Sequence, residues 1–371
     1  MDFLLLFIYM QYFNIRVCQV LHGIIGGGSE QVVLNYCSRM HNIHFDLLYQ
    51  YEPNPEILER FNEAGINCIQ IPDKVHHPFK HLWTIFKIFY EGHYDVVHSH
   101  LDWYMNSYVC FLATLAGVKK RIAHHHQAYS KWGLICVILR ILCKLFATHW
   151  LACGEAAAIS GWGKRAVKNG HVTILPNAID PVRFKFNKFA RQETRVKYGI
   201  KPDDYVIGQV GRFFPEKNHK FTIDLFEKIY RKHPNSWLLL IGDGPLLQEI
   251  QNTVTKLDLG DRVIFTGLQK DVVPYYCTMD VLLLPSTREA FPMTLIEAQY
   301  NGLQCIVSDA VPKEAAITDS VYPLSINDVS CWVNKIDSLG PVRNDEAPLI
   351  KSSQFNINQC YKMLESLYQI P

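Results

Sequence analysis

The sequence has 371 residues, more than one ordinary domain holds, so its length predicts two domains. Hydrophobic residues make up 49% of the chain and charged residues 19%, a composition that indicates ordered domains with large cores. The formal net charge is only +2 and no long run of Lys and Arg occurs, so nucleic acid is not an expected partner.

Two apolar segments raise the question of membrane contact. Residues 1–13, MDFLLLFIYMQYF, lack a basic start and a cleavage site and are too short to span a bilayer. We interpret them as a membrane-facing extension or as residues upstream of a true start near Asn14. Residues 131–150 carry Arg140 and Lys144 centrally, and each charge at mid-bilayer costs about 2.5 to 3.5 kcal/mol. This segment predicts a buried core helix or, alternatively, a helix lying on anionic lipid.

Short β-rich runs alternate with amphipathic segments along the whole chain. The first half contains IRVCQVL, FDLLYQ, DVVHSH, RIAHHH and HWLAC, and the second YVIGQVG, SWLLLIG, RVIFTG, DVLLLP and QCIVSD. This succession predicts an α/β protein with two Rossmann-like domains, each a doubly wound parallel sheet. We expect domains at residues 1–180 and 181–352, with an amphipathic helix in residues 353–371. Ligands of such sheets bind outside the carboxyl ends of the strands.

A glycine-rich turn follows the first predicted strand. LHGIIGGGSEQVV places Gly26, Gly27 and Gly28 between a strand and a helix, where backbone amides can approach a phosphate. The alternative is a plain tight turn. The segment is not a dinucleotide fingerprint, because Gln31 stands where a small residue must pack.

Histidines gather at the ends of two further strands. Alternation along RIAHHH points His124 and His126 to one side and His125 to the other. A histidine at this strand end either contacts a hydroxyl of a bound ligand or packs as a polar core group. We expect no metal site, because no Cys or carboxylate with zinc spacing accompanies these residues. His98 and His100 in DVVHSH are expected to be structural, with His100 the nearer to the ligand edge.

Two basic residues follow the strand at residues 205–210. VGRFFPEKNHKF places Arg212 and Lys217 five positions apart, just past the carboxyl end of that strand. Fixed cations at this position would stabilise the charge that builds on a departing diphosphate. The alternative is that both are ordinary surface residues.

The stretch STREAFPMTLIEAQYNG combines an expected anion site with two carboxylates. Pro292 suits the first position of a helix, so the amides of residues 293–295 should be free to bind an anion. Glu289 and Glu297 would repel that anion and should instead accept hydrogen bonds from hydroxyls. An anionic middle with hydroxylated ends describes a nucleotide-diphosphate sugar. The alternative is a surface loop residue and a solvated helix residue.

These motifs together resemble the retaining glycosyltransferases of family four, with the GT-B architecture, and most closely the bacterial capsule and exopolysaccharide type. The residues that carry the likeness are GGGSE, DVVHSH, KKRIAHHHQ, LACGEAA, LPNAID, GRFFPEKN, IGDGP and EAFPMTLIEAQ. The resemblance implies that the second domain binds the nucleotide sugar and the first the acceptor. It also implies that the closing helix crosses back to the first domain.

The resemblance also implies roles for individual residues. His126, Glu289, Arg212 and Lys217 match the active-site residues of the family, and Gly27, Gly28, Phe291, Pro292, Met293 and Glu297 match positions that contact the donor. Such enzymes use no metal and no cofactor beyond the donor, and retain the anomeric configuration by same-face attack. Three positions depart from the family pattern: Ala290 replaces a common Gly, Gln304 a frequent Pro, and His125 a frequent Ser.

We therefore expect a metal-independent hexosyltransferase-type enzyme that moves a sugar from a nucleotide-diphosphate sugar, UDP-linked, to a saccharide acceptor carried by a lipid. It would work in the cytoplasm, peripherally on the inner face of the plasma membrane, where its apolar segments contact anionic lipid. The alternatives are a nucleotide-sugar epimerase of the same architecture and a non-catalytic nucleotide-sugar-binding partner. A glycoside hydrolase is disfavoured, because its two carboxylates would leave Arg212 and Lys217 without a role.

Overall fold

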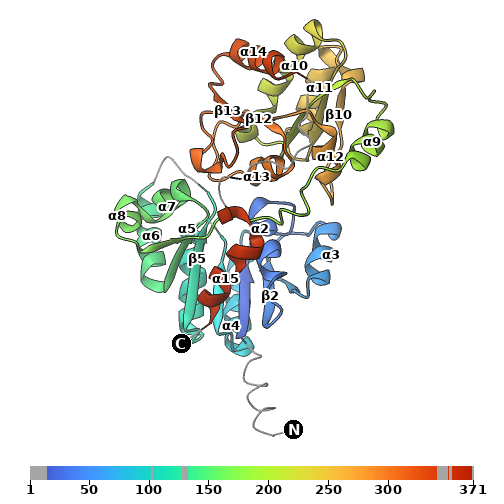
Figure 1. Ribbon diagram of the computed structural model, residues 1–371. Coiled ribbons are helices and arrows are strands. Elements are labelled where there is room, and N and C mark those ends of the chain that lie inside the picture. Colours follow the sequence, from blue (N-terminus) through green and yellow to red (C-terminus); the bar gives the residue numbers. More distant parts are fainter. Residues whose placement is uncertain (1–14, 102, 128–132, 341–349, 351–352, 370–371) are drawn as a thin grey trace. The chain divides into compact units, whose positions relative to one another are not determined.

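The computed structural model describes residues 15–101, 103–127, 133–340, 350 and 353–369, so the apolar residues 1–13 lie outside the described part (Figure 1). The chain divides into two compact units. Unit 1 comprises the residues up to Ala178 together with those from Gln354 onward, and unit 2 is Ile179–Ser353. Each unit is built on one parallel sheet, which confirms the α/β class with two Rossmann-like sheets.

Unit 1 contains a seven-stranded sheet in the order β3-β2-β1-β4-β5-β6-β7. The strands are β1 (Ile15–Val20), β2 (Ile43–Tyr49), β3 (Asn67–Gln70), β4 (Val96–Ser99), β5 (Lys120–His125), β6 (His149–Ala152) and β7 (Val172–Ile174). The winding direction reverses between β1 and β4, which pair in parallel. Ligands of doubly wound sheets bind at the carboxyl ends beside such a reversal.

Helices cover both faces of this sheet. One face carries α2 (Gly28–Cys37), α3 (Pro55–Glu63) and α15 (Ile357–Tyr368), and the other carries α4 (Pro78–Gly92), α5 (Trp103–Leu115) and α6 (Leu134–Phe146) (Figure 1). The chain then continues through α7 (Glu155–Trp162) and α8 (Lys164–Lys168). Cys18 and Val97 pack under α4 and α5, whereas their strand neighbours Gln19 and His98 face α15. Strand alternation therefore gives the sheet one apolar and one partly polar face.

The closing helix α15 packs on unit 1, as the resemblance implied. The Tyr368 hydroxyl accepts a hydrogen bond from Gln19 Nε2 at 2.8 Å and lies 2.6 Å from His98 Nδ1. Lys120 Nζ donates to the carbonyl oxygens of Leu367 and Gln369 at the end of the helix. A cation at a helix C-terminus satisfies carbonyls that have no partner within the helix.

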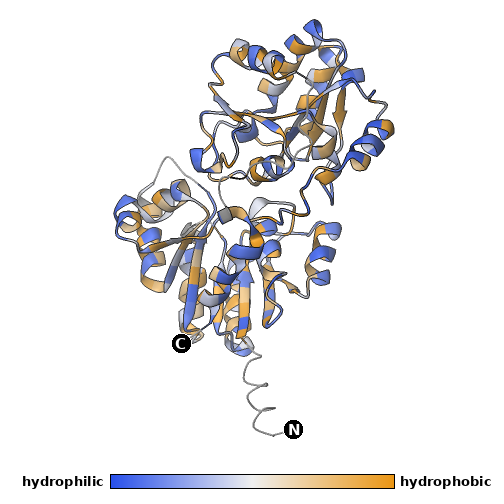
Figure 2. Ribbon diagram, viewed as in Figure 1, coloured by the Kyte–Doolittle hydropathy of each residue, from blue (hydrophilic) through white to orange (hydrophobic). Residues whose placement is uncertain are grey.

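Unit 2 contains a six-stranded sheet in the order β10-β9-β8-β11-β12-β13. The strands are β8 (Tyr205–Val210), β9 (Ser236–Ile241), β10 (Val263–Phe265), β11 (Val281–Leu284), β12 (Gln304–Ser308) and β13 (Val321–Leu324). The helices are α9 (Lys188–Lys197), α10 (His219–Lys232), α11 (Leu247–Lys256), α12 (Val273–Thr278), α13 (Met293–Tyr300) and α14 (Val329–Leu339). The strands β9 and β11 are almost wholly hydrophobic, as befits parallel strands covered on both faces (Figure 2).

A buried ion-pair group anchors α9 at the amino end of β11. Asp280 accepts hydrogen bonds from Arg191 at 2.5 Å, from Arg195 at 2.9 Å and from the Val206 amide at 2.7 Å. The Asp280 side chain is 1% exposed. Removing one partner of such a group leaves an uncompensated buried charge, so this cluster holds the start of unit 2 to its sheet.

Helix α6 corrects one expectation from the sequence. Ile135, Ile141 and Leu145 are exposed, so α6 is not the buried core helix that its composition predicted. Lys144, in contrast, lies on the inner side, where its Nζ donates to the Trp162 carbonyl at 2.7 Å at the end of α7. Among the described residues, none of the helices is both long and apolar enough to cross a bilayer.

Candidate active site

The strongest polar contact at the ligand edge of unit 2 joins Lys217 and Glu289. Lys217 ends the short 3₁₀ helix Pro215–Lys217 after β8, and Glu289 lies in the loop after the neighbouring strand β11. The Lys217 Nζ donates to Glu289 Oε1 at 2.5 Å, and the side chains are 25% and 9% exposed. Ser286 Oγ donates to the same carboxylate oxygen at 2.7 Å. The ion pair therefore orients both side chains. The Lys217 ammonium has three N–H donors and uses one of them for Glu289.

The backbone around Lys217 is held by residues that the sequence did not single out. Gln209 Nε2 donates to the Lys217 carbonyl at 2.8 Å, and Thr222 Oγ1 donates to Gln209 Oε1 at 2.6 Å. Asn218 takes a left-handed conformation with φ 55° and donates to the Pro285 carbonyl at 3.1 Å. The signal available in the sequence was a polar Gln inside the apolar run VIGQVG, and the structure shows that this residue is fully buried.

Arg212 lies in the same loop after β8 and stacks on an aromatic ring. Its guanidinium carbon is 4.5 Å from the centre of the Phe214 ring. The glycines of IGDGP hold this loop in place: a Cβ at Gly242 would lie 2.1 Å from the Gly211 carbonyl oxygen. Only a glycine lets the two backbones approach this closely, and so the segment carrying Arg212 is fixed.

Glu297 is buried on α13. It accepts a hydrogen bond from the Tyr276 hydroxyl at 2.7 Å. Burial, followed by the nearby Glu297 charge, raises the pKa of Tyr276 well above its ordinary value, so this phenol stays protonated and donates. The alternative that Glu297 is a solvated helix residue is therefore wrong.

The start of α13 differs in detail from the expectation. Pro292 is the N-cap residue and not the first helical residue, with Met293 at the first helical position. The Leu295 amide donates to the Pro292 carbonyl at 3.2 Å, so the prediction that all three amides of residues 293–295 are free was wrong for Leu295. Phe291 and Met293 are both buried. Gly302, with φ 77°, follows the C-cap of the helix.

Unit 1 brings four imidazoles together at the ends of β4 and β5. This histidine cluster consists of His98, His100, His124 and His126, with ring centres 4.0 Å apart for His98 and His100 and 4.1 Å apart for His124 and His126. His125 points the opposite way, 4.9 Å from the Trp162 ring, which confirms the predicted alternation.

The histidine cluster is uncharged in its buried part. Burial and then repulsion from neighbouring imidazoles lower the pKa of His98, His100 and His124 well below the ordinary value. One ring nitrogen of each of these three lies within 4.8 Å of the others, and neutral imidazole is the form that binds metals. Several ring nitrogens of the cluster are hydrogen-bonded, including His98 Nε2 to His124 Nδ1 at 3.3 Å and His100 Nε2 to Gln19 Oε1 at 2.8 Å, whereas His124 Nε2 has no hydrogen-bond partner among the described residues. The expectation that no metal binds stays a prediction.

The glycine turn of unit 1 contains a carboxylate of its own. Gly27 is the N-cap of α2, and Glu30 accepts hydrogen bonds from the amides of Ile25 at 2.9 Å and Gly26 at 2.6 Å. A Cβ built on Gly28 meets no heavy atom within 4 Å, so this position borders open space. Glu30 occupies two amides of the turn, and the proposed approach of Gly27 and Gly28 to a phosphate stays a prediction.

The predicted site residues thus fall into two sets. His126, Gly27 and Gly28 belong to unit 1. Unit 2 holds the other seven: Arg212, Lys217, Glu289, Phe291, Pro292, Met293 and Glu297. Within the second set, Lys217 and Glu289 contact each other through an ion pair.

Known proteins resemble the chain along most of its length. A family model described as "Glycosyl transferases group 1" matches residues 190–339. The putative glycosyltransferase EpsF of Bacillus subtilis is 31% identical over 91% of this chain and 91% of its own. An Escherichia coli enzyme, UDP-Gal:alpha-D-GlcNAc-diphosphoundecaprenol alpha-1,3-galactosyltransferase, is 28% identical over 87% of both chains.

Solved structures share the fold. Anabaena Alr3699/HepE in complex with UDP-glucose superposes with a TM-score of 0.80 over 96% of this chain and 100% of that chain, at 16% identity. At this identity the likeness establishes the GT-B type fold alone.

Proposed function

The chain belongs to the group 1 glycosyltransferases, and we propose that it transfers a sugar from a UDP-linked donor to a lipid-carried saccharide in capsule or exopolysaccharide biosynthesis. The observation that carries the proposal is the Lys217–Glu289 pair at 2.5 Å, placed at adjacent strand ends beside the start of α13. The Escherichia coli relative is named for a UDP-linked donor and a diphosphoundecaprenol-linked acceptor, and this supports the proposed donor and acceptor.

Unit 2 would hold the donor. Lys217 and Arg212 neutralise the diphosphate, Glu289 binds hydroxyls of the transferred sugar, and Glu297 binds the ribose. Tyr276 donates to Glu297 Oε2, and a carboxylate can accept several hydrogen bonds at once, so a ribose hydroxyl can join this group. Before the donor arrives, Glu289 keeps the Lys217 ammonium at the strand end, so little reorganisation is needed when the diphosphate binds.

Transfer proceeds with retention and without a metal in this proposal. The bond between the anomeric carbon and the diphosphate oxygen breaks, and the acceptor oxygen bonds that carbon from the same face. The acceptor proton passes to the departing diphosphate, so no carboxylate nucleophile is required. Lys217 and Arg212 stabilise the charge that develops on the leaving group, which is where fixed cations accelerate a reaction most.

Unit 1 would hold the acceptor, with His126 near its hydroxyl and Gly27 and Gly28 near the diphosphate. A lipid-carried acceptor requires the enzyme to work at a bilayer, so we place it in the cytoplasm, peripherally on the inner face of the plasma membrane. No specific observation favours an epimerase or a non-catalytic partner over this function.

A thermal-shift series in EDTA tests donor binding. UDP, UDP-sugars, GDP and GDP-sugars are compared, because a ligand that binds only the folded state stabilises it by about 2.7 kcal/mol at 100 times its Kd. We expect UDP and a UDP-sugar to raise the Tm and the Lys217→Ala variant to lose most of that shift. The absence of any shift with every nucleotide would contradict the proposal.

A second assay separates transfer from the alternatives. Donor consumption is followed with and without an undecaprenyl-diphosphate saccharide. Consumption that requires the acceptor indicates transfer, whereas conversion of the donor sugar without acceptor indicates an epimerase.

A further inference from the structure

Helix α4 has an apolar stripe on each of two sides. Ile85 and Phe89 are fully buried against the sheet, as an amphipathic helix of a globular domain requires. On the outer side, however, Phe79, Trp83 and Tyr90 are 87%, 64% and 60% exposed. A second apolar stripe at helical spacing does not contribute to the core, and monomeric proteins rarely expose such a surface without a binding role.

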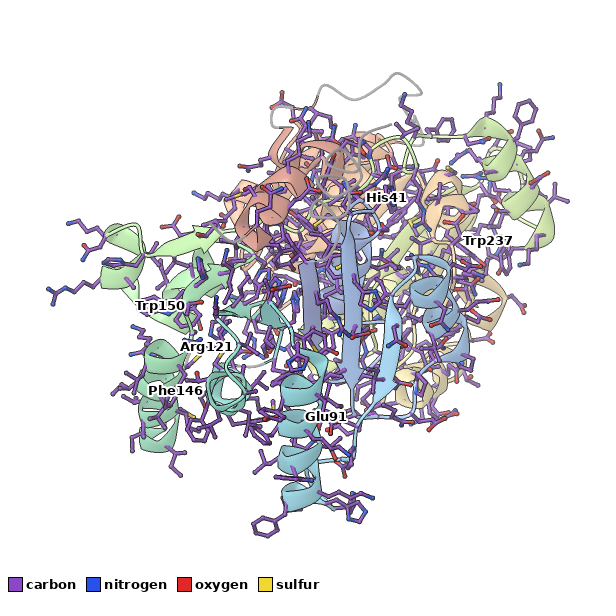
Figure 3. The ribbon with its side chains drawn as sticks, turned by 90° about the horizontal axis from the view of Figure 1, so that it is seen from below. His41, Glu91, Arg121, Phe146, Trp150 and Trp237 are labelled. Carbon is purple, nitrogen blue, oxygen red and sulfur yellow. The ribbon has the colours of Figure 1, made fainter. Side chains whose placement is uncertain are left out.

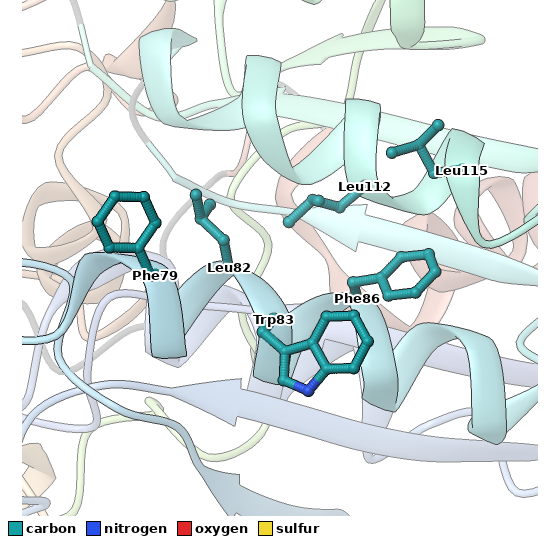
Figure 4. A pocket seen from close by; sticks show the side chains of 6 residues that line it. All are labelled: Phe79, Leu82, Trp83, Phe86, Leu112 and Leu115. Carbon is teal, nitrogen blue, oxygen red and sulfur yellow. The ribbon is translucent and has the colours of Figure 1, made fainter.

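The outer stripe continues onto α5 as a shallow groove. The groove has a volume of about 380 Å³ and is lined by Phe79, Leu82, Trp83, Phe86, Leu112 and Leu115 (Figure 4). The aromatic rings of the outer stripe contact one another: the ring centres of Trp83 and Phe86 are 5.8 Å apart, and those of Phe86 and Tyr90 are 5.9 Å apart. Figure 4 shows Leu82 and Phe86 on the side of α4 toward Leu112 and Leu115 of α5.

Helix α6 extends the same layer. Its exposed residues Ile135, Ile141 and Leu145 lie on the helix beside α5, to which it is joined by the Phe111–Phe146 ring contact at 5.0 Å. Phe146 ends α6 and Glu91 lies near the end of α4, both in the helix layer below the sheet (Figure 3). We call the outer surface of α4, α5 and α6 the apolar face.

Charge distinguishes the apolar face from the opposite face of the sheet. Helices α4, α5 and α6 carry four basic and one acidic side chain, and without Lys144, which lies on the inner side of α6, their net charge is +2. Helices α2, α3 and α15 carry two basic and five acidic side chains, a net charge of −3. Apolar and aromatic residues combined with Lys and Arg are the composition of surfaces that lie in the headgroup region of anionic bilayers.

We propose that the apolar face docks on the anionic surface of a phospholipid bilayer, with Phe79 and Trp83 inserted at the headgroup boundary. This proposal specifies which surface makes the membrane contact, and it rests on the proposed function, which requires the enzyme to work at a bilayer. Trp and Tyr occupy the membrane–water interface because one end of each ring is apolar and the other is polar. Lys80 and Lys87 on the same helix supply the attraction to anionic headgroups.

Flotation with vesicles tests the docking. The full chain is mixed with vesicles of phosphatidylcholine plus phosphatidylglycerol or of phosphatidylcholine alone. We expect at least tenfold stronger partitioning onto the anionic vesicles, since each basic residue near the surface adds about 1 kcal/mol, or roughly fivefold, and Lys80 and Lys87 both contribute. The variant Phe79→Gln/Trp83→Gln should partition onto the anionic vesicles at least tenfold more weakly than the unmodified chain, because two aromatic side chains no longer enter the apolar part of the bilayer.

A matched control is Phe189→Gln, which removes an equally exposed ring from α9 of unit 2. This control should float as the unmodified chain does. Equal flotation of the double variant, or no flotation of the unmodified chain, would overturn the proposal. So would a dimer in solution that the double variant abolishes, because the face would then bind a second copy.

The docking assay is independent of catalysis. The double variant should keep its Tm and its UDP-induced shift, because both side chains point outward. A normal UDP shift without flotation overturns the docking face alone, whereas flotation without any nucleotide shift overturns the proposed donor function alone.

A different observation concerns the direction of the hydrogen bonds in the histidine cluster. Gln19 Nε2 donates to Tyr368, so Gln19 Oε1 faces His100 Nε2 at 2.8 Å. A carbonyl oxygen only accepts, and so His100 carries its proton on Nε2. Neutral His100 then accepts through Nδ1, which lies 2.9 Å from His126 Nε2.

The geometry points to Gln19 and His100 as positioning residues that hold His126 with its proton on Nε2 and its lone pair on Nδ1. With that tautomer, His126 Nδ1, a buried atom, can accept a hydrogen bond from a hydroxyl but cannot donate one. This use of His126 rests on the proposed function, whereas the tautomer itself does not.

Nitrogen-15 NMR of the histidine rings tests the tautomer without any substrate. His126 is assigned with His126→Gln, and we expect its Nε2 to carry the proton. Gln19→Leu removes the acceptor of His100 Nε2 and should give a mixture of tautomers. A proton on Nδ1 of His126 in the unmodified chain would overturn the inference. Binding of one Zn²⁺ that shifts the His98, His100 and His124 rings together would also overturn it.

Discussion

The two sheets present opposite kinds of polar group at their carboxyl ends. Unit 2 places a charged pair there, Lys217 and Glu289, and keeps the ammonium a quarter exposed. Unit 1 places imidazoles there and buries His98, His100 and His124 so thoroughly that they stay neutral. The comparison teaches that topology fixes where polar groups gather, while burial fixes whether they carry charge. A charged edge suits a diphosphate, and a neutral edge suits hydroxyls.

The largest expected change in stability comes from removing the buried carboxylate of Asp280, which lies at neither sheet's carboxyl end. Asp280→Ala leaves two guanidinium groups without their buried carboxylate, so the free energy of unfolding should fall by about 3 to 5 kcal/mol. Urea unfolding measures the change. The exposed pair Arg231–Glu227 provides a control, because Arg231→Ala should cost only about 0.3 to 0.5 kcal/mol. Similar losses in both variants would contradict the structural role of Asp280.

At the charged edge, Lys217→Ala should lower turnover by roughly 10² to 10³, the size of losing one fixed charge donor. Its effect on unfolding should be smaller than that of Asp280→Ala, because Lys217 is partly solvated. Initial rates with saturating donor and acceptor measure turnover. Lys220→Ala, an exposed lysine on the next helix, should keep normal rates. Near-normal turnover of Lys217→Ala would remove the charged edge from the mechanism.

At the neutral edge, stability should depend on pH. The pKa values of His98, His100 and His124 are lowered in the folded chain, whereas unfolded histidine titrates near 6.5. Below that pH only the unfolded state takes up these protons, so stability is complete above about pH 6.5 and falls as pH decreases. One pH unit lower, each such histidine costs about 1.4 kcal/mol.

Urea unfolding across this pH range measures the slope. His98→Gln/His124→Gln should flatten it, since two of the contributing groups are gone. His219→Gln serves as a comparison from unit 2, where burial lowers the pKa of one isolated histidine to about 4. An unchanged slope in the double variant would show that the cluster is not held neutral.

The smallest expected effect concerns the glycine turn. A Cβ at Gly28 meets no atom within 4 Å, so Gly28→Ala should change the unfolding free energy by less than about 1 kcal/mol. If a phosphate approaches Gly28, the added methyl group should weaken UDP-sugar binding by roughly tenfold. Titration calorimetry measures the affinity, with Gly133→Ala at the N-cap of α6 as the matched control. Unchanged affinity would exclude Gly28 from the donor site.

Several features of the site were accessible to sequence reasoning for simple geometric reasons. Strand alternation placed His124 and His126 on one side of β5, because successive side chains of a strand point to opposite faces. Parallel winding placed Lys217 and Glu289 at neighbouring strand ends. The sequence did not indicate that these two would pair, nor that Glu30 would accept the amides of Ile25 and Gly26. Such contacts depend on loop paths, which no periodicity encodes.

The sequence by itself determined the class of fold and the residue types that reach each sheet edge, because hydrophobic periods of two and of 3.6 residues specify strands and helices directly. Only the tertiary structure decided which side of α4 is covered and which stays exposed. That helix carries two apolar stripes, and periodicity says which residues share a side but not which side meets the sheet. The same limit applies to charge: burial and partners, which arise only on folding, make Lys217 half of an ion pair and His100 a neutral acceptor.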